Sequence, residues 1–128
     1  MKFKNYWKTL LIALIILTGS IMSGNKLNKI PLFEVKNSDK LIHFTMYFGL
    51  MLSMLSSYYK SIGNIKNTNK VVIFFIAVLY GLILEGIQYF FTTDRSAEFA
   101  DMIANTLGCF IGLLYYPLLL RFNLYKIL

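Results

Sequence analysis

Two ionisable side chains, Glu85 and His43, lie in stretches of sequence that are otherwise apolar enough to sit in lipid. A charged side chain near the centre of a bilayer costs about 2.5–3.5 kcal/mol on insertion scales, so such residues usually face a protein interior or a water-filled cavity. A buried glutamic acid beside a histidine can transfer protons as a general acid–base pair, but such a pair can also be purely structural. Both interpretations remain open, and no other catalytic candidate stands out.

Polar and small residues form one stripe along each of two consecutive predicted helices. The first stripe is Gly81, Glu85 and Gln88, and the second is Asp101, Asn105, Gly108 and Gly112. Residues three, four or seven positions apart share a helical face. Two helices joined by a short loop are antiparallel neighbours, so we expect each to bury its stripe against the other, with the glycines allowing close packing.

A further polar cluster opens the preceding apolar run, where Lys40, His43 and Tyr47 share one helical face. Asp39 adds a pair with His43 four positions on. If successive helices alternate in direction, this cluster reaches the same membrane level as the loop end of the two striped helices. The candidate ligand-binding residues at this level are Asp39, Lys40, His43, Tyr47, Glu85, Gln88, Arg95, Asp101 and Asn105.

Several of these residues also have simpler interpretations. Asp39 and Asp101 stand where acidic side chains cap helix N-termini and meet the positive end of the helix dipole. Lys40 can extend its ammonium group to lipid headgroups. Gln88 and Asn105 can serve as hydrogen bonds between helices, each contributing about 0.6 kcal/mol.

Composition indicates an integral membrane protein. Of 128 residues, 57% are hydrophobic and only 15% charged, with a mean hydropathy of +0.60, whereas an ordinary soluble domain carries more charge. Four apolar runs, at about residues 6–22, 41–59, 71–91 and 102–120, each approach the roughly 20 residues that a helix needs to cross a bilayer. We therefore predict an all-α fold, in which residues 1–128 form a single domain with a bundle of four transmembrane helices.

The first apolar run also has features of a secretory signal, since Lys2, Lys4 and Lys8 precede it. However, Ile21 and Met22 stand where a cleavage site needs small residues. We therefore expect this helix to be retained.

The remaining chemistry of the sequence is limited. The net charge of +7 is scattered between apolar runs and forms no basic helix or ribbon, so we expect no nucleic-acid binding. Cys109 is the only cysteine, which excludes an intramolecular disulfide and a thiolate metal cage. One histidine without HExxH spacing predicts no zinc site, and we expect no metal and no cofactor, although a calcium or magnesium bridge to a lipid phosphate stays open. No Ser-His-Asp arrangement supplies a nucleophile.

Three segments together resemble the VanZ-like family. They are DKLIHFTMYFGL from Asp39, GLILEGIQYF from Gly81 and RSAEFADMIANTLGCFIG from Arg95. The resemblance covers about residues 39–112 and holds in both order and spacing. One local departure is the threonine and aspartate before Arg95, where many members of the family have a proline or glycine turn.

The resemblance implies a small multi-pass protein of the bacterial cytoplasmic membrane. The family's named member is associated with resistance to teicoplanin, a glycopeptide with a fatty acyl chain that acts on cell-wall precursors at the outer face. We therefore expect this chain to engage a membrane lipid, a lipid-linked cell-wall precursor or a lipoglycopeptide at the outer leaflet, and to lower teicoplanin susceptibility. The alternatives are an intramembrane enzyme that modifies a lipid or lipid-linked glycan through Glu85 and His43, and a structural partner of another membrane protein through Gly108 and Gly112.

Basic residues in short loops favour the cytoplasmic side of a membrane, so we predict that both termini are cytoplasmic. The inner side then carries Lys2, Lys4, Lys8, Lys60, Lys66, Lys70, Arg121 and Lys126. In intact cells, a single cysteine introduced at Asn37 should react with an impermeant label, whereas one introduced at Asn67 should not. Reaction at Asn67 alone contradicts this orientation.

Overall fold

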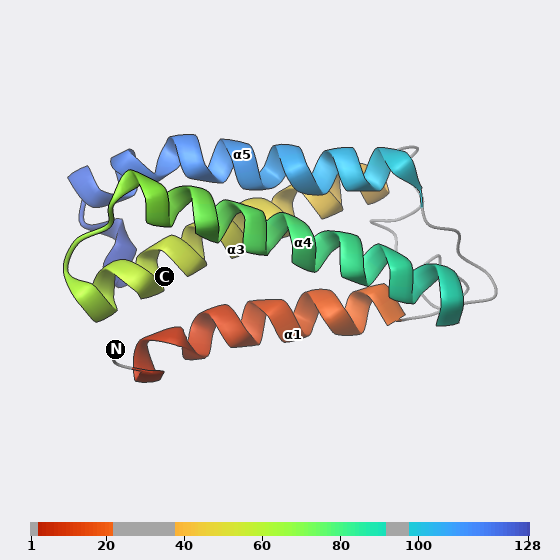
Figure 1. Cartoon of the computed structure of the whole chain (residues 1–128), viewed down its shortest axis with the longest axis horizontal. Coiled ribbons are helices and arrows are strands. Elements are labelled where there is room, and N and C mark those ends of the chain that lie inside the picture. The colour runs from red at the N-terminus through yellow and green to blue at the C-terminus, as the bar shows by residue number, and fades with distance from the viewer. Residues whose placement is uncertain (1–2, 22–37, 92–97) are drawn as a thin grey trace.

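The computed structural model describes residues 3–21, 38–91 and 98–128, and these ranges contain helices and no strand. In chain order the elements are η1 (Phe3–Tyr6), α1 (Trp7–Ile21), α3 (Ser38–Ile62), α4 (Asn67–Phe91), α5 (Phe99–Arg121) and η3 (Leu124–Lys126). The four α-helices lie along one another (Figure 1). The all-α prediction is therefore confirmed. Arg95 lies outside the described residues.

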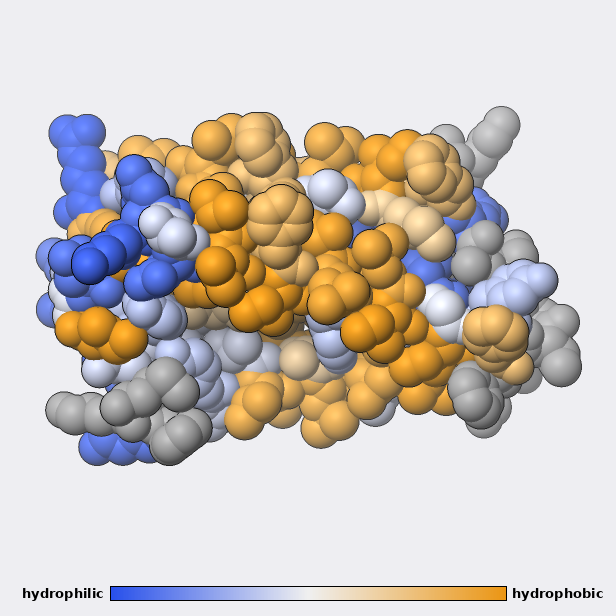
Figure 2. Space-filling model, viewed as in Figure 1, coloured by the Kyte–Doolittle hydropathy of each residue, from blue (hydrophilic) through white to orange (hydrophobic). Residues whose placement is uncertain are grey.

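Three of the helices suit a membrane span. α3 and α4 have 25 residues each and α5 has 23, and all three are long and apolar enough to cross a bilayer. α1 is shorter, with 15 residues. An apolar surface covers the middle of the molecule, and hydrophilic residues gather at its ends (Figure 2). α3, α4 and α5 extend past the predicted apolar runs because polar residues at their ends continue the helices.

α3 is the helix on which the bundle assembles, since it contacts every other described element. Its most extensive contact is with α5. Hydrogen bonds between the two helices join residues 61 or 62 positions apart, from His43 to Asn105 near one end and from the Tyr116 hydroxyl to the Leu55 carbonyl oxygen farther along. A constant separation means that α3 and α5 run parallel in a fixed register. α4 connects them and runs in the opposite direction (Figure 1).

The glycines of α5 lie against the backbone of α3. A Cβ atom on Gly108 would stand 2.3 Å from the carbonyl oxygen of Phe44, and one on Gly112 would stand 3.1 Å from the carbonyl oxygen of Phe48. The expectation that the α5 stripe turns toward α4 is therefore wrong for these glycines. Spacing within a helix shows which residues share a face but not which helix opposes it. The Gly108 face is covered within the chain, so it is not available to a second membrane protein.

Gly81 of α4 also makes room for α3. A Cβ atom there would lie 3.1–3.3 Å from the ring and hydroxyl of Tyr47. Tyr47 is only 1% exposed, so its ring fills the space beside the glycine. Two turns into α3, it packs in the interior of the bundle.

α1 joins the bundle through hydroxyl groups. The Thr9 hydroxyl lies 2.9 Å from the hydroxyls of both Ser53 and Ser57 on α3. Farther along α1, the Tyr80 hydroxyl of α4 donates to the carbonyl oxygen of Ala13 at 2.7 Å. Helices in lipid gain little from the hydrophobic effect on associating, so hydrogen bonds and close packing hold them together. The sequence analysis did not identify these contacts.

A methyl group added at Gly108 should destabilise the protein, because the nearest atom is a backbone carbonyl that cannot move aside. We expect Gly108→Ala to reduce the free energy of unfolding by about 1–3 kcal/mol, the usual cost of overpacking. Thermal unfolding in detergent, followed by circular dichroism, measures the effect.

Gly86→Ala is the matched control, since nothing lies within 4 Å of a Cβ atom at that position. Alanine is the better helix former by up to about 1 kcal/mol, so this variant should be at least as stable as wild type. Equal melting temperatures for the two variants would contradict the close packing of α3 and α5.

Candidate polar site at one end of the bundle

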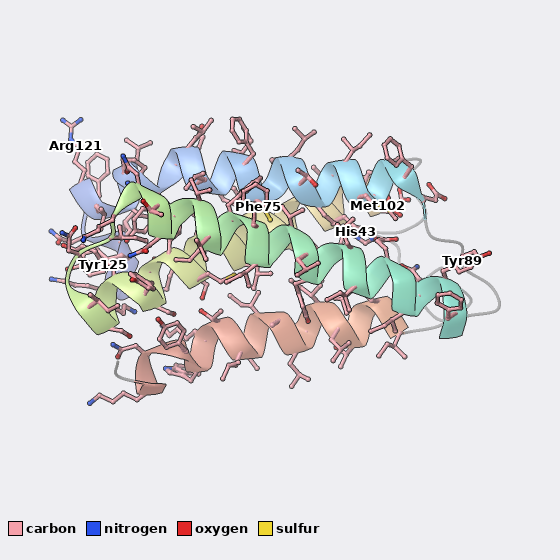
Figure 3. The ribbon with its side chains drawn as sticks, in the orientation of Figure 1. His43, Phe75, Tyr89, Met102, Arg121 and Tyr125 are labelled. Atoms are coloured by element: carbon pink, nitrogen blue, oxygen red, sulfur yellow. The ribbon has the colours of Figure 1, made fainter. Side chains whose placement is uncertain are left out.

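The polar residues singled out by the sequence gather at the end of the bundle where α3 and α5 begin. Figure 3 places His43 in that half, toward the Tyr89 end of α4, and Arg121 and Tyr125 at the opposite end. Two parallel helices present their N-termini here, and the positive ends of their dipoles favour acidic side chains. Asp39 lies in the first turn of α3 and Asp101 in the first turn of α5.

Lys40 is held by three carboxylates from two helices. Its Nζ lies 2.7 Å from Asp39 Oδ2, 2.8 Å from Glu98 Oε2 and 3.5 Å from Asp101 Oδ1. The Glu98 side chain is 50% exposed and the Asp101 side chain only 5%. The ammonium group therefore bridges the surface of the bundle and its interior, and it ties the start of α3 to the start of α5.

His43 lies one turn deeper and links all three long helices. Its Nδ1 is 3.0 Å from Asn105 Oδ1 on α5 and 3.8 Å from Glu85 Oε1 on α4. An amide oxygen accepts hydrogen bonds, so in this arrangement Nδ1 carries the proton and donates it to Asn105 Oδ1, whereas Glu85 Oε1 lies beyond hydrogen-bond distance of this nitrogen. Glu85 is 2% exposed and Asn105 is 3% exposed. The imidazole thus joins two buried side chains that belong to different helices.

The cluster contains two groups of possible cation ligands. Ligand atoms of His43, Glu85 and Asp101 lie within 4.8 Å of one another, and the same holds for Asp39, Glu98 and Asp101. Lys40 neutralises the second group, because its ammonium contacts all three carboxylates. The first group is deeper and combines one imidazole with two carboxylates, donors that suit a divalent ion.

Two acidic residues at the start of α5, Glu98 and Asp101, take positions that the sequence analysis did not predict. Asp101 is not the N-cap of α5, because the helix begins at Phe99 and Glu98 is its N-cap residue. Asp101 instead points its carboxylate toward Lys40. Glu98, which the sequence analysis left out, joins the cluster because it lies three residues before Asp101 and so shares its face.

The other predicted site residues lie deeper or elsewhere. Gln88 is buried on α4, three residues beyond Glu85, and Tyr47 is buried one turn below His43. Cys109 is fully buried and unpaired by any disulfide, as expected for a packing residue. Three side chains that spacing placed on one α3 face, Lys40, His43 and Tyr47, therefore form successive layers from the bundle end inward.

Comparison with known proteins identifies the family. The family model VanZ/LLP1 matches residues 2–121, nearly the whole chain. The chain belongs to the VanZ/LLP1 family. The match extends past residues 39–112, on which the resemblance rested, and takes in α1 and the whole of α5. No curated protein and no solved structure matches the chain. Membership of VanZ/LLP1 and three apolar helices of spanning length together indicate a membrane protein.

Removing the Lys40 ammonium should destabilise this end of the VanZ/LLP1 bundle, because the buried Asp101 carboxylate loses its cation. We expect Lys40→Met to reduce the free energy of unfolding by about 1–3 kcal/mol, the cost of leaving a buried polar group without its partner. Asp101→Asn in the same chain should recover part of this loss, since the amide carries no charge. Melting temperatures of the two single variants and the double variant test the coupling, and additive losses would contradict it.

Proposed function

We propose that this VanZ/LLP1 protein binds the polar head of a lipid-linked ligand at the end of the bundle where α3 and α5 begin. The observation that supports this is that the polar cluster extends from the surface of the bundle into its interior. It runs without interruption from the half-exposed Glu98, through Lys40, to Asp101, and the buried His43–Glu85 pair lies one turn deeper. A ligand anchored in the bilayer by its acyl chain presents its head at this level, so it reaches the cluster without leaving the membrane.

The donors and acceptors of the cluster match such a head. Arg95 is the proposed contact for a phosphate or carboxylate group, which a guanidinium group binds through charge-assisted hydrogen bonds. Lys40, which already contacts three carboxylates, is proposed to take part by exchanging the half-exposed Glu98 for the ligand anion. Glu85, Gln88, Asn105 and Tyr47 are proposed to bind hydroxyl and amide groups. The Tyr47 hydroxyl is buried and makes no hydrogen bond among the described residues, so it is available as a donor.

The proposed ligand is a lipid-linked cell-wall precursor or an acyl-bearing glycopeptide, because the cluster is proposed to face the outer leaflet. The basis for this orientation is the gathering of basic residues at the other end of the bundle. In this view the protein lowers teicoplanin susceptibility by occupying or shielding the lipid-anchored component. Resistance would then depend on the cluster and not on the bundle as a whole.

A second candidate function rests on the buried pair of His43 and Glu85, in which Nδ1 and Oε1 are 3.8 Å apart. This distance suits an acid–base pair that tightens when a substrate binds. The protein would then be an intramembrane enzyme that modifies a lipid or lipid-linked glycan. Glu85→Gln preserves the shape of the side chain but removes proton transfer, so it separates the two functions: an enzyme loses all activity yet still binds its lipid.

Teicoplanin and vancomycin susceptibility of a sensitive Gram-positive host tests the proposal. Wild type should protect against teicoplanin, and both Glu85→Gln and Arg95→Ala should reduce protection to the level of the empty host at matched membrane abundance. Phe122→Ala is the control, because Phe122 is exposed at the opposite end of the bundle, and it should protect fully. Equal protection by all four proteins would rule out the cluster as the source of resistance.

Lipid copurification tests binding without the resistance phenotype. Mass spectrometry of purified protein should show a lipid enriched over the bulk membrane in wild type and Phe122→Ala, and this lipid should be lost in Arg95→Ala. The shielding function predicts loss in Glu85→Gln as well, whereas the enzymatic function predicts retention. If wild type enriches no lipid, the binding proposal is wrong.

A further inference from the structure

The end of the bundle opposite the polar cluster contains a basic hollow of about 400 Å³. Three lysines line it from three separate elements: Lys4 from η1, Lys60 from the last turn of α3 and Lys126 from η3. Tyr59 and Tyr125 also line it and pack edge to face, with ring centroids 5.0 Å apart. These five residues are called the basic basin below.

The lysines of the basin have no carboxylate partner among the described aspartates and glutamates. All four of these, Asp39, Glu85, Glu98 and Asp101, belong to the cluster at the other end. Lys60 Nζ instead donates to the carbonyl oxygen of Lys126 at 3.2 Å. A carbonyl oxygen carries only a partial charge, as do the C-termini of α3 and α5, so the described side chains leave the basin with a net positive charge.

A neighbouring lysine adds to the same contact. Lys8 Nζ donates to the carbonyl oxygen of Ile127. This bond holds the residue after η3 against α1, while the Lys60 contact holds η3 against α3 and places Lys126 beside Lys60. The lysines are therefore held near one another by the fold, although like charges repel. An arrangement that the protein maintains against this repulsion suits an anionic ligand.

The surroundings of the basin are apolar and exposed. Ile62 at the end of α3 is 52% exposed, and Leu124 and Ile127 beside η3 are 45% and 69% exposed. In Figure 2 the hydrophilic end of the molecule lies directly beside the apolar middle. Tyrosine rings favour the headgroup level of a membrane, where one end of the ring is apolar and the other wet. The basin therefore lies where phosphate groups and acyl chains meet.

We infer that the basic basin binds the headgroup of an anionic phospholipid in the leaflet that contains η1 and η3. The phosphate accepts hydrogen bonds from Lys4, Lys60 and Lys126, and the tyrosine hydroxyls contact the remaining headgroup oxygens. The acyl chains lie on the exposed apolar side chains beside the basin. Basic pockets between membrane helices recognise anionic headgroups in this way. The site is separate from the polar cluster and does not depend on the function proposed for it.

The test uses the purified full chain in detergent with added phosphatidylglycerol or phosphatidylcholine. Phosphatidylglycerol should raise the melting temperature of wild type more than phosphatidylcholine does, and native mass spectrometry should show it bound. Replacing all three lysines in Lys4→Gln/Lys60→Gln/Lys126→Gln should weaken phosphatidylglycerol binding by roughly a hundredfold, because each lysine near an anionic headgroup contributes about fivefold and the three factors multiply.

A matched control removes the same charge from the same end. Lys66→Gln/Lys70→Gln/Arg121→Gln also loses three cations, but none of these residues lines the basin. Arg121 lies in the last turn of α5, as Lys60 does in α3. The control variant therefore also tests whether any cation at a helix C-terminus, inside the basin or not, contributes to phosphatidylglycerol binding. The control should retain most of the preference for phosphatidylglycerol. Equal losses in the two triple variants would show diffuse surface charge and overturn the site.

Two further measurements complete the test. Lys4→Arg/Lys60→Arg/Lys126→Arg keeps the charge and should keep the lipid preference, and loss of the preference in this variant would contradict a site that binds through charge. Inorganic phosphate at millimolar concentration should neither stabilise wild type nor compete with phosphatidylglycerol. If phosphate stabilises wild type as much as the lipid does, the basin binds a free anion and the proposed lipid site is wrong. The proposal is also wrong if wild type shows no preference for phosphatidylglycerol over phosphatidylcholine.

Discussion

Backbone contact between α3 and α5 at Gly108 holds these parallel helices closer than any larger side chain permits. The contact fixes the register of the residues between it and the N-terminal ends of both helices. With Gly108 against Phe44, Asn105 one turn earlier in α5 meets His43, the residue next to Phe44 in α3. A further turn brings Asp101 to Lys40. The polar cluster is therefore a consequence of close packing deeper in the bundle, and not only of attraction between its own charges.

The parallel pair also explains why the two ends of the molecule differ in charge. α3 and α5 both begin at the cluster, and both end beside the basic basin. The positive ends of two helix dipoles add at the first end, and the negative ends add at the second. Asp39 and Asp101 lie in first turns, whereas Lys60 and Arg121 lie in last turns. The positive-inside distribution of a membrane protein and the dipoles of its helices thus favour the same arrangement in this chain.

Much of this architecture could be predicted from the sequence. The apolar runs identified all four helices, and the isolated polar residues Glu85, His43 and Asn105 identified a cluster that the structure brings together. The partner of α5 could not be predicted, because a glycine stripe requires a close neighbour without specifying it. The rule that short loops join neighbouring helices favoured α4, whereas the closest backbone belongs to α3. Glu98 was missed because its role depends on where α5 begins, which spacing alone does not fix.

α1 and α5 are attached to α3 by different interactions, and these interactions determine how each helix is prevented from sliding along α3. Thr9 bonds to Ser53 and Ser57, and Ser61 continues the same α3 face one turn later. Ser61 is itself engaged, because its hydroxyl donates to the carbonyl oxygen of Ser57 and accepts a hydrogen bond from the Asn5 amide. A displacement of α1 by one turn, about 5.4 Å along α3, would therefore break the Asn5–Ser61 bond and the bond from Tyr80 to Ala13 together. Directional hydrogen bonds fix the height of α1 on α3, whereas steric contact with the backbone fixes the height of α5.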